Sequence, residues 1–406
     1  EMIRNVYKEC KGVPKSNCLT KEQRLSLQMD EFMNRRYEFR YNTQIGEVEY
    51  RERFSFRFYF HPIDKRAQNS IMLDAQSEGI GVWDRDIDRY LHSNRVPIYN
   101  PLEEFLFHLP HWDGKDRIHA LANRVPCNNP HWELLFHRWF LNMVSHWRGV
   151  NKMYANSTSP ILVGAQGTHK STFCREMIPP ALRAYYTDSI DFSQKRDAEL
   201  YLNRFALINI DEFDQITLTQ QGFLKHILQK PVVNLRKPHG RSVLELQRYA
   251  SFIGTSNQKD LLTDPSGSRR FICIEVTGNI DTTQPIDYEQ LYAQAMHEIS
   301  HGERYWFNSE DEQIMTENNR EFEQTPAMLQ LFYQYFRAPQ AGEEGEFFTP
   351  VEILNYLKKK SGISLSDNKV YHFGRMLQKC GITSKHTYKG TVYQVCLLYT
   401  SDAADE

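Results

Sequence analysis

One stretch of the chain decides its fold class: Ile161-Leu-Val-Gly-Ala-Gln-Gly-Thr-His-Lys-Ser-Thr172. A short apolar run is followed by a glycine-rich turn and then by residues suited to the start of a helix. Glycines let the backbone turn so that its N–H groups, with the positive end of a helix dipole behind them, face a phosphate. The order strand, glycine-rich turn, helix therefore predicts a nucleotide-binding P-loop.

The residue types in this loop predict individual roles. Lys170 is expected to contact the β- and γ-phosphates of ATP, and Ser171 to bind Mg²⁺. The complete predicted nucleotide-binding set is Gly164, Gln166, Gly167, Thr168, His169, Lys170, Ser171 and Thr172. His169 stands where the usual pattern has glycine, and its side chain can be accommodated if its backbone is helical. Taken alone, the motif could also be a chance glycine-rich turn.

A second motif lies about 40 residues further on. The apolar run 206–210 ends in Asp211 and Glu212. At this spacing Asp211 is expected to orient the Mg²⁺ shell, and Glu212 to polarise the attacking water as general base. The alternative is that the two carboxylates cap the following helix, and the first motif weighs against it.

Two further candidates follow in the chain. Asn257, after the apolar run 251–254, is expected to position the lytic water as the sensor-1 residue. Arg269 and Arg270 precede the apolar run 271–274. In a ring ATPase, arginines at this point act on the nucleotide of the neighbouring subunit. The alternatives are a turn asparagine and a pair of solvated arginines.

The apolar runs themselves indicate the architecture. They are short, and polar residues follow them, as in a parallel sheet covered on both faces. The sequence therefore predicts an α/β fold with a P-loop core of AAA+ type, preceded by a helix that Asn129 caps and Pro130 opens. The expected division is an N-terminal α+β region at 1–95, a helical lead-in at 96–157, the ATPase domain at 158–338, a winged-helix-like domain at 347–399 and a tail or cloning scar at 400–406.

Two basic segments are candidates for DNA contacts. Apolar runs flank a turn that carries Arg236, Lys237, His239 and Arg241, which predicts a hairpin facing the pore of a ring and gripping backbone phosphates. A plain solvent-exposed hairpin is the alternative. Near the C-terminus we expect one helix to start at Thr349 and a second at Ser366, followed by a β-ribbon. This order predicts a winged helix in which Arg375 and Lys389 contact DNA, although many winged helices bind protein instead.

The N-terminal region is rich in aromatic residues. Alternation at 37–41 and 48–50 around a turn at Gly46 predicts a β-hairpin. Phenylalanines alternate with polar residues again over 54–60, which predicts another strand. Beside arginines such a stripe could bind nucleic acid. The preferred interpretation is the buried face of a sheet.

Composition excludes several classes of protein. A net charge of −2 is not that of a polycation, so nucleic-acid binding must come from local patches. The seven cysteines are scattered singly, which argues against a disulfide framework and a zinc site. His108 and His111 belong to a polar connector rather than a metal site. Without an apolar run of membrane-spanning length or a signal core, we expect a cytoplasmic protein with no membrane partner.

Four motifs in this order, at 164–172, 209–213, 248–257 and 264–271, resemble the virulence-associated protein E family. The segments Tyr99-Asn-Pro-Leu-Glu-Glu and Trp112-Asp-Gly-Lys-Asp116 look like that family's lead-in region, and the resemblance covers roughly residues 95–330. The C-terminal part looks like the winged helix of Bacteroidetes-type members. The resemblance implies a hexameric AAA+ ring, dependence on ATP and Mg²⁺, and work on DNA at a replication origin or fork. It also makes a primase a candidate partner, since residues 1–95 show no catalytic acidic cluster.

Together these features predict an ATP-hydrolysing, DNA-dependent motor, helicase-like, that serves the replication of a phage, plasmid or genomic island. A second hypothesis is a P-loop kinase for a small molecule. Such a kinase needs no sensor asparagine, arginine pair or basic hairpin, and this sequence has all three. The third is a non-hydrolysing, ATP-binding DNA-loading adaptor. Glu212 argues against it, because such a protein has no chemical need for that carboxylate.

Overall fold

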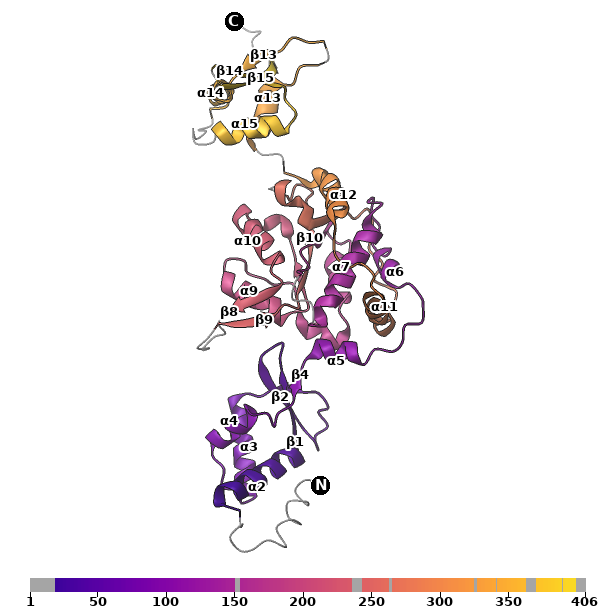
Figure 1. Cartoon of the computed structure of the whole chain (residues 1–406), viewed down its shortest axis with the longest axis vertical. Coiled ribbons are helices and arrows are strands. Elements are labelled where there is room, and N and C mark those ends of the chain that lie inside the picture. The colour runs from indigo at the N-terminus through magenta and orange to yellow at the C-terminus, as the bar shows by residue number, and fades with distance from the viewer. Residues whose placement is uncertain are drawn as a thin grey trace. The chain divides into compact units, whose positions relative to one another are not determined.

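The computed structural model describes residues 19–149, 154–235, 243–262, 265–324, 327–340, 342–362, 370–388 and 390–398. The fold is mixed α/β and contains a parallel sheet. By contacts the chain divides into two compact units, Glu1–Gln258 with Gly267–Asn319, and Lys259–Ser266 with Arg320–Glu406. Figure 1 shows the elements along the chain.

The parallel sheet is the centre of the first unit. Its five strands lie in the order β11-β5-β10-β7-β6, and every neighbouring pair is parallel. The bounds are β5 Ser159–Val163, β6 Tyr186–Thr187, β7 Leu207–Ile210, β10 Ser251–Ser256 and β11 Phe271–Glu275. Four of these are the predicted apolar runs, and they are buried almost throughout because helices cover both faces. Figure 1 shows α7 on one side of β10 and α10 on the other.

The helices of this sheet region have the following bounds: α5 Pro101–Phe107, α6 Ile118–Ala122, α7 Trp132–Trp147, α8 Lys170–Glu176, α9 Lys195–Arg204, α10 Leu218–Leu228, α11 Tyr288–Ser300 and α12 Ser309–Asn319, with 3₁₀ turns η3 Pro180–Tyr185, η4 Phe213–Gln215 and η5 Pro265–Arg270. The core is built around α7, whose Trp139 and Trp147 are fully buried.

The N-cap prediction for α7 is wrong by two residues. The N-cap is His131, and the Asn129 side chain instead accepts from the His131 N–H at 2.9 Å, so its oxygen lies two residues before the N-cap position.

The N-terminal lobe, residues 19–99, has its own sheet and its own apolar core. Its helices are α2 Lys21–Arg36, α3 Lys65–Ser77 and α4 Asp84–Leu91, and its strands are β1 Tyr37–Asn42, β2 Glu47–Glu52, β3 His61–Pro62 and β4 Ile98–Tyr99. The predicted hairpin is confirmed as β1 and β2, which pair antiparallel with Tyr41 opposite Val48. The left-handed turn that joins them is at Gly46, φ 72°.

The predicted strand over 54–60 is wrong. This segment is an irregular loop between β2 and β3, and its rings are exposed instead of buried. The core of the lobe is already filled by helices and the hairpin, so the stripe has no second layer to pack against.

In the second unit the elements are η6 Arg320–Phe322, α13 Ala327–Tyr335, β12 Phe336–Arg337, β13 Glu346–Phe348, α14 Pro350–Ser361, α15 Val370–Lys379, β14 Ser384–Thr387 and β15 Gly390–Leu397. The predicted helix at Thr349 is confirmed, with a capping box between Thr349 and Glu352. Strands β12, β13 and β14 each pair antiparallel with β15, and the helices pack on them through a separate core. The predicted second helix start at Ser366 lies outside the described residues.

Candidate nucleotide site

The predicted P-loop connects the end of β5 to the start of α8. Gly164 lies so close to the next segment that a Cβ there would come within 3.0 Å of the Val276 carbonyl oxygen. Gly167 has φ 85°, a conformation that favours glycine. Both glycines are therefore required by the backbone path.

Lys170 is the first residue of α8, and its side chain turns back over the loop. Its ammonium donates to the carbonyl oxygens of Gly164 and Ala165, each at 2.7 Å, and lies 3.3 Å from both Thr168 Oγ1 and Asn257 Oδ1. The side chain is buried, at 6% exposure, and burial lowers its pKa. Among the described residues no carboxylate forms an ion pair with it. A bound anion would therefore be strongly stabilised here.

The second motif meets the first at this edge of the sheet. Ser171 Oγ donates to Asp211 Oδ1 at 2.9 Å, which connects the start of α8 to the end of β7. Thr255, at the end of the neighbouring β10, also donates to Asp211. The structure thus brings together three of the predicted residues, Lys170, Ser171 and Asp211, with Asn257 beside them.

Backbone strain is concentrated in the same place. Among the described residues, His169 and Glu212 are the two non-glycine residues with positive φ, at 66° and 52°. The condition set for accommodating the His169 side chain, a helical backbone, is not met: the residue is left-handed, because the loop must turn sharply before α8 begins. A left-handed L-residue costs about 1–2 kcal/mol, and such costs collect at functional sites.

The remaining predicted loop residues are placed as follows. Gln166, Ser171 and Thr172 are exposed, and Thr168 donates to the Ala165 carbonyl at 2.9 Å. The His169 ring lies 3.3 Å from Thr282 Oγ1, and the Ile280 N–H donates to the Thr168 carbonyl at 3.1 Å. The segment after β11 therefore borders the loop.

Glu212 is exposed immediately after Asp211, at the carboxyl end of β7. Asp214, two residues on, accepts from Ser256 Oγ at 2.8 Å and from the Asn257 N–H at 3.4 Å. This carboxylate fixes the turn that presents Asn257. Sequence reasoning missed both Thr255 and Asp214, although polar residues at the carboxyl ends of buried strands were a usable signal.

The arginine pair is not brought to this site. Arg269 and Arg270 end η5 and precede β11, whose first residue Phe271 is level with Ser159 at the start of β5. They lie at the amino end of the sheet, about 13 Å of strand away from the P-loop edge. Arg269 is exposed and donates to Glu312 Oε2 of α12 at 2.9 Å.

The predicted basic hairpin is present as two antiparallel strands, β8 Val232–Leu235 and β9 Leu244–Gln247. Its tip, with Arg236, Lys237, His239 and Arg241, lies outside the described residues, as does Lys389. Arg375 is exposed on α15.

A buried arginine supports the strand that carries Thr255 and Asn257. Arg248 is fully buried, and its guanidinium donates to five carbonyl oxygens at 2.7–3.1 Å, those of Ala250, Ile227, Leu228, Lys230 and Asn156. Three of them lie at the end of α10, where the helix dipole favours a cation. Burial lowers the Arg248 pKa to about 9, so the group is still charged at neutral pH.

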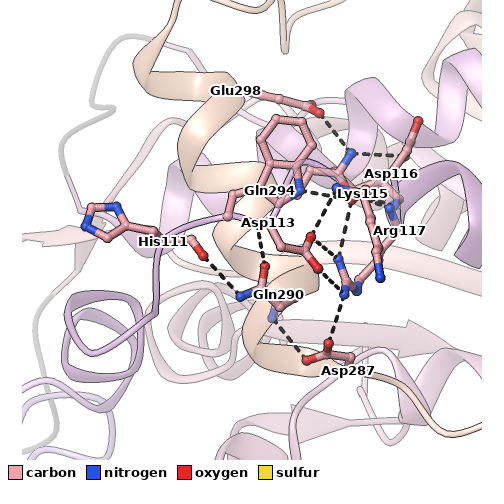
Figure 2. A network of polar contacts seen from close by, with 11 residues as sticks. His111, Asp113, Lys115, Asp116, Arg117, Asp287, Gln290, Gln294 and Glu298 are labelled. Atoms are coloured by element: carbon pink, nitrogen blue, oxygen red, sulfur yellow. Dashed lines mark hydrogen bonds and ion pairs between the residues drawn. The ribbon is translucent and has the colours of Figure 1, made fainter.

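The segment before α6 is tied to α11 by a polar network (Figure 2). Arg117 donates twice to the Asp113 carboxylate, at 2.7 and 2.8 Å, and this pairing holds the pKa of Asp113 well below its usual range. Gln294 of α11 accepts from the Arg117 N–H at 2.6 Å and donates to Asp116 at 2.9 Å. The His111 ring points away from this network, while its carbonyl accepts from Gln290. These contacts hold residues 111–117 against α11.

Within the part of the chain that the structure describes, no group of three or more His, Cys, Asp or Glu side chains could hold a metal ion. No described helix combines the length and apolar character needed to span a membrane.

The family model of the virulence-associated protein E-like domain matches residues 106–324, more than half of the chain. A second model, a domain of unknown function from B. Theta (DUF3874), matches residues 325–395. A search of the curated proteins found no match. Among solved structures, the apo structure of the NrS-1 C-terminal region is similar at 11% identity and TM-score 0.46, covering 91% of this chain and 98% of that one. Two A-form apo structures of the same region give TM-scores of 0.42 and 0.41, at 12% and 11% identity, covering 91% of this chain and 98% and 99% of theirs.

Proposed function

The chain belongs to the virulence-associated protein E-like family, and we propose that it is an ATP-hydrolysing, DNA-dependent motor of the ring-forming AAA+ type. Its work is helicase-like and serves the replication of a phage, plasmid or genomic island. ATP and Mg²⁺ are the cofactors, single-stranded or forked DNA is the substrate, and a primase is the candidate protein partner.

One observation carries the proposal: a buried ammonium without a carboxylate partner lies beside a hydroxyl–carboxylate pair. Lys170 donates only to uncharged oxygens, so its charge is available to phosphates. Ser171 and Asp211, 2.9 Å apart, are the oxygen ligands that Mg²⁺ prefers. These residues fit a magnesium nucleotide, which supplies the phosphoryl group that water attacks.

The roles of the other residues follow from their positions at the same edge. Glu212 accepts a proton from the attacking water, because it is exposed just beyond Asp211. Asn257 orients that water, because Asp214 fixes its turn and Lys170 contacts its amide oxygen. Positive φ at both His169 and Glu212 supports a functional site, since strain of this kind is retained where function needs it.

The sheet supports the P-loop assignment. Its five strands are all parallel, in the chain order 5-1-4-3-2, and Ser171 and Asp211 meet at the carboxyl ends of two of them. Arg269 and Arg270 lie at the amino end of the sheet, where they cannot act on the nucleotide bound to their own chain. In the proposed hexameric ring they act on the nucleotide of the neighbouring copy, which is the role of an arginine finger.

We place DNA contacts at the tip of the β8–β9 hairpin and on the C-terminal unit. In that unit, α14, α15 and the β14–β15 ribbon follow one another in winged-helix order. Arg375 is exposed on the second of these helices, where a winged helix presents its recognition surface.

The decisive experiment is ATP hydrolysis by the full chain with Mg²⁺, with and without single-stranded DNA, beside Glu212→Gln. We expect DNA-stimulated turnover, reduced about 10²–10⁴-fold in the variant with ATP binding retained, because only the proton acceptor is lost. The matched control is Glu199→Gln, a carboxylate on α9 that pairs with Lys230 away from the loop.

Each other outcome selects a different function. Full turnover in Glu212→Gln places the base elsewhere. Turnover that DNA does not change favours a kinase for a small molecule. ATP binding without turnover favours the DNA-loading adaptor, with His169 as the residue to replace first.

A further inference from the structure

The loop Arg53–Phe60 of the N-terminal lobe, here called the aromatic loop, exposes an unusual amount of aromatic surface. Its rings at Phe54, Phe56, Phe58 and Tyr59 are 86%, 96%, 77% and 66% exposed. Burying one such ring contributes about 1.5–3 kcal/mol to stability, so four exposed rings in one loop forgo a large favourable free energy of burial. Contiguous apolar patches of this kind mark interaction sites.

The loop is nevertheless anchored at both ends. At its start, the Arg53 N–H donates to the Arg36 carbonyl at 2.9 Å, and the Arg53 side chain pairs with Glu38 at 2.7 Å. Toward its end, Arg51 donates to the Phe58 carbonyl at 3.0 Å. Phe60 is stacked on the guanidinium of Arg40, 4.0 Å from its ring centre. The rings are therefore presented on a fixed base.

A pocket opens at the foot of the loop. Its volume is about 410 Å³, within the usual range for sites that hold a small ligand. The first and last residues of the aromatic loop, Arg53 and Phe60, both line it, so the loop forms its rim. The rest of the lining includes the aromatic side chains of Tyr37, Phe39, Tyr90 and Tyr99.

Charge identifies the kind of ligand. The aromatic loop carries two arginines, Arg53 and Arg57, and no carboxylate. The three guanidinium groups that line the pocket are each paired with a carboxylate, Arg40 with Glu49, Arg53 with Glu38 and Arg95 with Asp30. The exposed Arg57 forms no ion pair among the described residues, so its charge is available to an anionic ligand. A ligand that matches both features is flat and negatively charged. Single-stranded nucleic acid has this chemistry, since its bases stack on aromatic rings and its phosphates pair with arginine.

We propose that the aromatic loop and its pocket bind single-stranded DNA, with bases stacked on Phe54, Phe56 and Phe58 and an adjoining nucleotide in the pocket. This site is separate from the hairpin and the C-terminal unit, and it reads no sequence, because every base has a π-face. It shares with the proposed function the premise that DNA is the partner. It does not depend on ATP binding or hydrolysis.

The test is the affinity of the full chain, without nucleotide, for a fluorescein-labelled oligothymidylate of about 16 residues, a length that one such site can fill. The variant carries Phe54→Ala, Phe56→Ala and Phe58→Ala together. We expect its dissociation constant to rise about a hundredfold, since each of the three stacked bases is worth about fivefold or more. The matched control is Phe107→Ala, which removes a ring that is 84% exposed on α5.

Two single variants sharpen the test. Phe56→Trp keeps a stacking surface, so its affinity stays within about twofold of the parent. Arg57→Gln removes one phosphate contact, so the slope of log affinity against log salt falls by about 0.7. Both side chains are exposed, so neither change disturbs the core.

An unchanged affinity in the triple variant overturns the proposal. It is also overturned if the parent protein binds duplex as tightly as single strands and the variant loses both equally. Loss of a dimer or ring in light scattering would assign the aromatic loop to contacts between copies. Loss of sedimentation with anionic phospholipid vesicles would assign it to a membrane surface.

The two proposals fail separately. If ATP turnover is absent but the triple variant loses single-stranded DNA, the aromatic-loop site stands and the motor does not. If DNA stimulates turnover and the triple variant binds DNA normally, the motor stands and this site does not.

Discussion

Two loops of this protein leave a sheet at the end of a strand, and they differ in what their sequences specify. In the loop 164–169 the backbone path requires glycines. The ammonium of Lys170, which follows the loop, contacts a loop carbonyl and Asn257 beyond the neighbouring strand. In the aromatic loop, alternation predicted a strand, yet the backbone is irregular and its rings are exposed. A motif in which each residue has a chemical task is informative once a second motif at the expected spacing supports it. An alternating pattern says only that two faces differ, and burial requires a second layer to cover one of them.

The largest expected effect concerns the support beneath the first loop. Arg248→Met removes the donors of five buried carbonyl oxygens, so we expect the free energy of unfolding to fall by about 4 kcal/mol. The measurement is urea unfolding followed by tryptophan fluorescence. Arg57→Met in the aromatic loop is the matched control, because an exposed arginine changes stability by about 0.5 kcal/mol or less. If the two substitutions lowered the free energy of unfolding equally, the first loop would have no stronger structural support than the aromatic loop.

The next effect separates the loops by function. Lys170→Ala removes the buried ammonium of the proposed P-loop, so we expect ATP binding to weaken about a hundredfold. Binding of single-stranded DNA in the absence of nucleotide should be unchanged, because the aromatic loop does not involve Lys170. Isothermal titration with ATP measures the first quantity, and Lys65→Ala, an exposed lysine at the start of α3, is the control. Unchanged ATP affinity would remove the P-loop assignment.

The site was more predictable from sequence than its surroundings. Lys170, Ser171 and Asp211 were assigned from their residue types and from the order and spacing of two motifs, and the structure places them together because parallel strands end at one edge. Thr255 and Asp214 were missed, since a Thr or Asp near a strand end has many structural uses. The left-handed backbone of His169 was missed because the conformation of a loop residue depends on the path between β5 and α8, which no local pattern encodes.

Away from the site, prediction depended on whether an element was covered. The buried runs of the parallel sheet were identified because helices cover both faces and leave the strands mostly apolar. The β1–β2 hairpin was identified because its turn is local. Residues 54–60 carried an equally clear alternation, but what covers them is decided by α2, α3 and α4, which pack on the other elements of the lobe.

A smaller effect depends on pH and again distinguishes the two regions. His146 of α7 is fully buried and accepts from the Asn156 N–H at 2.8 Å. Burial, aided by the charge of Arg248, lowers its pKa to about 3. The unfolded chain takes up this proton near its ordinary value of about 6.5 and the folded chain does not. Stability from this group is therefore fully present above about pH 6.5 and falls by about 1.4 kcal/mol per pH unit down to about pH 3.

The corresponding measurement is urea unfolding at pH 7 and pH 5. His146→Gln supplies an oxygen that can accept the same hydrogen bond but does not titrate, so its stability should fall less between these values. Parent and variant curves that remain parallel would assign the pH dependence to other groups. Neither the lower pH nor His146→Gln should alter DNA binding by the aromatic loop, since none of the loop's residues is a histidine.

The smallest expected effect tests the backbone strain in the proposed P-loop. His169 has φ 66° where a glycine would adopt the same conformation without a Cβ penalty. His169→Gly should therefore raise ATP affinity by up to about fivefold, the equivalent of about 1 kcal/mol. His169→Val should lower it by at least as much, because a branched side chain is the least tolerant of this backbone. Titration of both variants with ATP decides the sign. If glycine weakens binding, the His169 ring and its contact with Thr282 hold the loop in the conformation that binds phosphate, and the departure from the usual motif is itself functional.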